Sequence, residues 1–196
     1  MFKKVILILV VLFSIQVLIS CIFCDCQDPE TYEITYTSVN VTALNTSGFT
    51  DQEITDSVYK NAFGLSVYMN SNFTLMHAVS PNFTLGFSTV MACSCFEDTY
   101  LYPDPLTNIT IFVVDTDTDV RTNISEKFKI QSYYYGLISL EEFFSQREDW
   151  YDGFQFELVD FNTIPNSAVF IVEAQLESGT LLTNETQEIN FYPIDL

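Results

Sequence analysis

The sequence predicts an all-β fold, an antiparallel β-sandwich with immunoglobulin-like or Greek-key-like connections and one or two short helices. Three observations support this prediction. Short segments repeatedly alternate apolar and polar residues with a period of two, turn residues separate these segments, and helical signals are few. The chain of 196 residues is long enough for one domain of ordinary size with a substantial core.

The predicted strands begin at Tyr32. Tyr32, Ile34 and Tyr36 alternate with polar residues, and the apolar phase then shifts to positions 39 and 41, which indicates a bulge near Thr37–Ser38. Similar alternation predicts further strands at 65–69, 83–87 and 154–158. Residues 109–114 are apolar on both faces apart from Thr110, which is typical of a central strand.

The last predicted element is a hairpin. Phe170, Val172, Ala174 and Leu176 form one apolar face, and the turn residues 178–179 follow them. The returning strand ends with Ile189 and Phe191.

Two segments predict short helices. Thr50-Asp51-Gln52-Glu53 resembles a capping box and precedes Ile54 and Val58 at helical spacing. Ser139-Leu140-Glu141-Glu142 repeats the same pattern before Phe143-Phe144.

The amino-terminal segment predicts export. Lys3 and Lys4 precede fifteen residues that are apolar except for Ser14 and Gln16, as in a secretory signal. A helix of that length spans about 22 Å, less than the hydrocarbon core of about 30 Å. We therefore expect a signal peptide at 1–20, a short segment at 21–30 and a β-sandwich domain at 31–196. An uncleaved anchor is the alternative.

Leu18-Ile19-Ser20-Cys21 resembles a bacterial lipobox. The resemblance implies cleavage before Cys21 and attachment of diacylglycerol to its thiol, which would anchor the mature chain in a membrane. The alternative is an ordinary secretory signal with a chance cysteine. Under the lipobox interpretation, segment 21–30 is the lipidated cysteine and a short tether.

The other cysteines form two Cys-x-Cys units, at Cys24 and Cys26 and at Cys93 and Cys95. In an extended strand, both thiols of such a unit point to one face, and a bond within the unit would be strained. An oxidising compartment favours disulfides, so we expect bonds between the two units, with either connectivity. A four-cysteine metal site is the rival interpretation, although its usual spacing has two intervening residues.

Charge restricts the function. The chain has 26 acidic and 7 basic residues and a formal net charge of −19, which becomes −21 without residues 1–20. This charge argues against nucleic acid and against electrostatic docking on anionic lipid. His77 is the single histidine, which excludes a multi-histidine metal site.

Two segments are candidate binding sites. Asp115, Asp117 and Asp119 alternate like calcium ligands, but Val120 stands where a calcium loop needs glycine, and a solvated turn is the simpler interpretation. Aromatic residues that could stack on a glycan follow: Tyr134, Trp150 and Tyr151.

Ser57-Val58-Tyr59-Lys60 matches a Ser-x-x-Lys pattern, but the companion motifs of penicillin-binding enzymes are missing from the sequence.

Seven Asn-x-Ser/Thr sequons are also present, at Asn40, Asn45, Asn72, Asn82, Asn108, Asn123 and Asn184. They keep open the alternative of a secreted eukaryotic N-glycoprotein.

The lipobox, the close cysteines, Thr-Tyr-Glu-Ile-Thr-Tyr at 31–36 and the hairpin at 170–179 resemble an uncharacterised lipoprotein family of Bacteroidota. The resemblance implies an outer-membrane lipoprotein of the cell envelope, periplasmic or surface-facing, and supplies no catalytic residues. We expect a non-enzymatic protein without a cofactor that binds an envelope protein or a glycan. A calcium- or carbohydrate-binding surface module and a hydrolase with an unrecognised site are the alternatives, and the oligomeric state is open.

Overall fold

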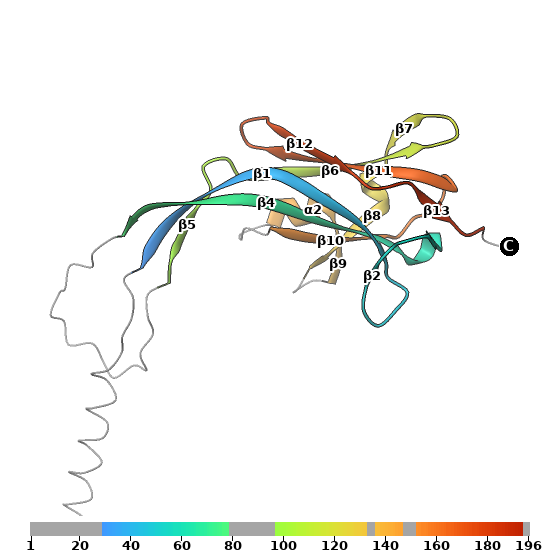
Figure 1. Ribbon diagram of the computed structural model, residues 1–196, viewed down its shortest axis with the longest axis horizontal. Coiled ribbons are helices and arrows are strands. Elements are labelled where there is room, and N and C mark those ends of the chain that lie inside the picture. Colours follow the sequence, from blue (N-terminus) through green and yellow to red (C-terminus); the bar gives the residue numbers. More distant parts are fainter. Residues whose placement is uncertain (1–28, 79–96, 133–135, 147–151, 194–196) are drawn as a thin grey trace, which may run out of the picture. The chain divides into compact units, whose positions relative to one another are not determined.

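The computed structural model describes residues 29–78, 97–132, 136–146 and 152–193 (Figure 1). The chain divides into two compact units. The larger unit comprises Thr35–Asn72 and Tyr102–Leu196. The smaller unit comprises Met1–Ile34 and Phe73–Leu101. Strands β1 (Glu30–Asn45) and β4 (Phe63–Ala78) each contribute residues to both units.

The larger unit is a sandwich of two sheets, which confirms the predicted all-β fold. The first sheet has the order β2-β1-β4-β10-β8-β9 and the second has the order β3-β13-β11-β6-β7, with β12 also paired to β11 (Figure 1). In the first sheet the remaining bounds are β2 Gln52–Glu53, β8 Phe128–Ser132, β9 Gly136–Ser139 and β10 Gly153–Leu158. In the second sheet they are β3 Ser57–Val58, β6 Leu106–Asp115, β7 Val120–Asn123, β11 Ser167–Leu176, β12 Leu181–Glu185 and β13 Ile189–Phe191.

Phenylalanines from both sheets meet in the core. Phe63 of β4 lies 4.5 Å, between ring centroids, from Phe170 of β11, and Phe191 packs edge-on at 5.2 Å from Phe63. Phe128 of β8 packs edge-on against Phe63 and Phe170, at 6.3 Å from each. All four rings are buried. Each such ring contributes about 1.5–3 kcal/mol through its burial, so this cluster is a main link between the sheets.

The predicted strands agree with the structure where one face is buried. Leu65, Val67 and Met69 of β4 are fully buried and alternate with more accessible residues. β6, the predicted central strand, lies between β11 and β7. Residues 154–158 form β10, and the predicted segment 83–87 lies outside the described residues. In β1 the buried positions change phase across Thr37–Ser38, both of which are exposed, as the sequence predicts.

The C-terminal hairpin is also confirmed, with a returning strand in two parts. β12 and β13 both pair antiparallel with β11, and Gly179 takes a positive φ of 88° in the turn before β12. Thr186 separates the two parts and is buried. Its backbone N–H donates to the Phe170 carbonyl at 2.9 Å, and its hydroxyl accepts from the Phe170 N–H at 3.1 Å. The hydroxyl therefore satisfies a backbone donor where the ladder is interrupted.

One of the two predicted helices forms. Helix α2 (Leu140–Gln146) follows Ser139, whose hydroxyl accepts a hydrogen bond from the Glu142 N–H at 3.1 Å. This is the capping contact that the sequence predicts. Two short 3₁₀ turns are also present, η1 (Lys60–Ala62) and η2 (Ser125–Lys127).

The helix predicted after Thr50 is wrong. Gln52 and Glu53 form β2 and pair with the end of β1, and the Ile54 N–H donates to the Ala43 carbonyl at 3.0 Å. The segment is rich in threonine, aspartate and serine, which have low helix propensity, and contains the β-branched Ile54 and Val58. Pairing with β1 therefore outweighs the local capping signal.

The smaller unit contains a short parallel pairing. The start of β1 pairs with β5 (Thr99–Leu101), and the ring of Tyr32 stacks on that of Tyr100 with centroids 5.8 Å apart. The Tyr32 hydroxyl donates to the Glu30 carboxylate, and this hydrogen bond is the main reason that the pKa of Tyr32 rises to about 12. Within the described part of the chain, no helix is long and apolar enough to cross a membrane.

Candidate functional site

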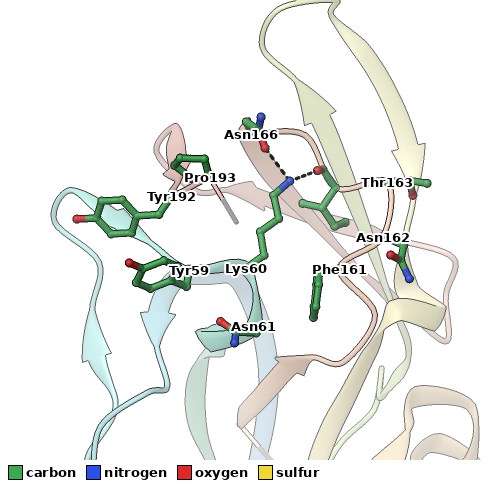
Figure 2. A pocket seen from close by; sticks show the side chains of 10 residues that line it. Tyr59, Lys60, Asn61, Phe161, Asn162, Thr163, Asn166, Tyr192 and Pro193 are labelled. Carbon is green, nitrogen blue, oxygen red and sulfur yellow. Dashed lines mark hydrogen bonds between the residues drawn. The ribbon is translucent and has the colours of Figure 1, made fainter. Parts of the chain in front are cut away.

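A pocket of about 800 Å³ lies in the larger unit beside the loop that joins β10 to β11 (Figure 2). The η1 turn and the chain after β13 form its other walls. Its lining residues are Tyr59, Lys60, Asn61, Phe161, Asn162, Thr163, Ile164, Asn166, Tyr192 and Pro193. This volume lies within the range of about 300–1,000 Å³ that is usual for small-molecule sites.

Two tyrosines stand at the rim because of a strand pairing. β13 pairs in parallel with β3, and the Tyr192 N–H continues this pairing by donating to the Val58 carbonyl at 3.0 Å. The pairing brings Tyr59 and Tyr192 together, with ring centroids 4.9 Å apart and planes tilted by 42°. Both side chains stay accessible, at 54% for Tyr59 and 44% for Tyr192. The rim therefore offers aromatic surface to a ligand.

Lys60 connects the η1 turn to the β10–β11 loop. Its ammonium donates to the Ile164 carbonyl and to Asn166 Oδ1, the latter at 2.9 Å (Figure 2). The ammonium also lies 5.7 Å from the ring centroid of Phe191. Burial lowers the pKa of Lys60, because the charged ammonium loses water.

The β10–β11 loop is held by hydrogen bonds at both ends. Asp160 Oδ1 accepts from the Asn162 N–H at 3.0 Å and from Asn162 Nδ2 at 2.8 Å, and the Asn166 carbonyl accepts from the Phe191 N–H at 2.8 Å. Between them, Thr163 takes a positive φ of 68°. A β-branched residue rarely adopts this conformation, which costs about 1–2 kcal/mol. Such strain is concentrated at functional loops, which supports a role for this one.

Comparisons of the chain with protein-family models, with curated proteins and with solved structures found no match. The pocket is therefore interpreted from its own residues. They supply two accessible aromatic rings, the amide side chains of Asn61, Asn162 and Asn166, and one ammonium group. Carboxylates, imidazoles and thiols are not among the ten lining residues. The set is suited to hold a polar ligand by stacking and hydrogen bonding.

Of the three aspartates in the calcium prediction, Asp115 ends β6, and Asp117 and Asp119 lie in the turn before β7. The Asp115 carboxylate accepts from the Asp117 N–H at 2.9 Å and from the Thr118 hydroxyl at 2.8 Å. The Thr118 bond is the largest cause of the lowered pKa of Asp115. Across the described ranges, no three acidic, histidine or cysteine side chains are grouped to hold a metal ion. Calcium binding by Asp115, Asp117 and Asp119 stays a prediction.

Other predicted sites lie outside the described residues. Cys21, with its predicted lipid, and the cysteines of the predicted disulfides, Cys24, Cys26, Cys93 and Cys95, all fall within 1–28 and 79–96. The aromatic residues Tyr134, Trp150 and Tyr151 fall within 133–135 and 147–151. Lipidation, the disulfides and that glycan-stacking surface remain predictions.

Six sequons lie in the described part of the chain. Asn40, Asn72, Asn108 and Asn123 are exposed, and Asn45 is half-buried. Asn184 is also half-buried, and its amide donates to the Val39 carbonyl at 2.8 Å.

Sequence reasoning missed this pocket. The sequence singles out Lys60 only as part of a Ser-x-x-Lys pattern. In the structure its ammonium donates to oxygens of the β10–β11 loop. The loop itself had a usable signal, because Asn162, Pro165 and Asn166 are concentrated between two predicted strands. No pattern in the sequence around Tyr192 indicates that this residue lines a pocket.

Proposed function

We propose that this chain is a lipid-anchored cell-envelope protein whose β-sandwich binds a glycan in this pocket without transforming it. The accessible pair Tyr59 and Tyr192, beside a loop that carries amide side chains, is the observation that supports this function most directly. A sugar ring has an apolar face of C–H groups and a rim of hydroxyls. Tyrosine rings fit the face, and amides both donate to and accept from the hydroxyls.

The other properties of the pocket favour binding over catalysis. General acid–base catalysis most often uses histidine or a carboxylate, and the ten described lining residues include neither. The lining comes from loops and a short turn on a rigid sandwich, which is a common arrangement for recognition sites. The volume of about 800 Å³ is large enough for a small saccharide.

Binding is tested with purified protein on a panel of neutral and acidic oligosaccharides, followed by calorimetry on the best ligand. Tyr59→Ala and Tyr192→Ala should each weaken the affinity about tenfold, because each removes a stacking surface worth about 1.4 kcal/mol.

Tyr68→Ala is the matched control for these variants. Tyr68 lies on β4 of the same unit, is 52% exposed and does not line the pocket. Its replacement should leave the affinity unchanged. A chain that binds no saccharide, or pocket variants that bind like the wild type, would overturn the proposal.

The anchor is the second part of the proposal, and it is supported by the resemblance of residues 18–21 to a lipobox. From Cys21 to Glu30 the chain reaches at most about 30 Å, so the start of β1 would stay near the bilayer. Intact mass of membrane-extracted protein should show that residues 1–20 are missing and that Cys21 carries acyl groups. An unmodified Cys21, or unchanged membrane retention of Cys21→Ala, would refute it.

A further inference from the structure

Lys60 is a partly buried cation in a strongly acidic chain. After residue 20 the sequence has five basic residues against 26 acidic ones. In the described part of the chain, two of these cations pair with carboxylates, Arg121 with Glu173 at 2.6 Å and Lys127 with Asp160 at 2.7 Å, and Lys129 is exposed. The oxygens that Lys60 binds belong to a carbonyl and an amide and carry no formal charge.

The described surroundings of Lys60 supply two uncharged hydrogen-bond acceptors and the ring of Phe191, but no carboxylate. Among the described residues, no carboxylate lies within ion-pair distance of its ammonium, and no lining residue of the pocket is acidic. An ammonium carries three protons, and Ile164 and Asn166 accept two hydrogen bonds, so one proton is left for a ligand. A partly buried cation favours a charged partner, and a ligand can supply one.

We infer that the glycan held by this pocket carries a carboxylate, as hexuronic and sialic acids do, and that the Lys60 ammonium binds it. This inference rests on the proposed glycan binding. Tyr59 and Tyr192 would take the sugar face, and Lys60 would distinguish an acidic sugar from a neutral one. The two hydrogen bonds to the β10–β11 loop hold the ammonium in place for this contact.

The strongly negative chain does not prevent such recognition. At physiological ionic strength the Debye length is about 8 Å, so distant carboxylates are largely screened. The carboxylate of a ligand in the pocket would be in direct contact with Lys60, and a charge-assisted hydrogen bond at contact is screened much less.

The test compares each acidic sugar with its own methyl ester, which has nearly the same shape and no charge. The probes are trigalacturonate, trimannuronate and sialyllactose, each as the free acid and as the ester, titrated into the protein in a calorimeter. At least one acid should bind about tenfold more tightly than its ester, because the ester loses the charge-assisted bond.

Variants then assign the preference to Lys60. Lys60→Met should reduce the ratio of acid to ester affinity to within about twofold, and Lys60→Arg should restore it. Tyr192→Ala should weaken acid and ester equally and leave their ratio unchanged. If Lys60→Met does not fold, as judged by circular dichroism, Lys60→Gln replaces it, with the same expected ratio of acid to ester affinity.

The outcomes separate the two proposals. If saccharides bind but acid and ester bind equally, the carboxylate inference is overturned and glycan binding stands. A folded Lys60→Met that keeps the full preference also overturns the inference, because the carboxylate is then recognised elsewhere. If no saccharide binds at all, glycan binding itself fails.

Discussion

Gly64 is expected to tolerate no side chain, because a backbone carbonyl of β10 and the side chain of Thr46 lie close to it. It lies in β4, opposite Glu157 of β10. A Cβ atom at this position would lie 2.7 Å from the Phe156 carbonyl oxygen and 2.9 Å from Thr46 Cγ2. The first of these atoms belongs to the backbone of a fully buried residue, so it cannot simply rotate away.

The expected cost of Gly64→Ala follows from this geometry. A carbon–oxygen contact has to lengthen by about 0.5 Å, which requires the backbones of β4 and β10 to separate, and overpacking of this kind costs about 1–3 kcal/mol. Phe156 also belongs to the core cluster, so the shift would disturb packing between the sheets. For a domain of this size, a loss of about 2 kcal/mol corresponds to a fall in melting temperature of about 4–8 °C.

Urea unfolding at 25 °C and thermal melting, both followed by circular dichroism, measure this loss. Gly153→Ala is the matched control on the same pair of strands, because its Cβ would lie 3.6 Å from Tyr68 Cδ2, an ordinary contact. We expect Gly153→Ala to change stability by less than about 1 kcal/mol, in either direction. Equal stability of Gly64→Ala and wild type, or equal losses in both variants, would show that the reasoning about close approach is wrong.

Three further predictions concern stability and connectivity. Thr186→Val should lower the free energy of unfolding by about 1–3 kcal/mol, because the buried Phe170 N–H loses its acceptor, and Thr186→Ser should recover most of it in urea unfolding. The pKa of Asp160 is lowered, and the hydrogen bond from Lys127 is the largest cause. The ionised Asp160 therefore stabilises the folded state above about pH 4, and this contribution is lost as the pH falls further. Lys127→Met should flatten that part of the pH profile of stability, and an unchanged profile would contradict this assignment. Non-reducing peptide mapping should join the peptide of Cys24 and Cys26 to that of Cys93 and Cys95, and separate peptides would rule the predicted disulfides out.

The sequence predicts the parts of this fold where a local pattern and the burial of one face coincide. Period-two alternation identifies β10 and β11 because one face of each strand faces the core. The cap at Ser139 identifies α2, because its hydrogen bond is made within four residues of chain. The segment after Thr50 has the same local pattern, yet pairing with β1 decides its structure, and no local pattern reveals that partner.

The candidate site was not predictable, because distant pairing creates it. Lys60 and Asn166 are 106 positions apart and meet through a hydrogen bond between a turn and a loop. Tyr59 meets Tyr192 through the parallel pairing of β3 with β13, two very short strands whose composition gives no sign of partnership. Alternation tells which face of a strand is buried, but not which strand lies beside it.

The position of β11 along the chain has a consequence for biogenesis. This strand pairs with β6, β12 and β13, and its Phe170 ring contacts Phe63 and Phe128 of the opposite sheet. A ribosome that has synthesised residues 1–166 has therefore made Phe63 and Phe128, but it has not yet made β11, the middle strand of the second sheet, or Phe170. The export proposed above would require the chain to cross a translocation channel before it folds, and the late synthesis of β11 delays completion of the sandwich until nearly all of the polypeptide has been made.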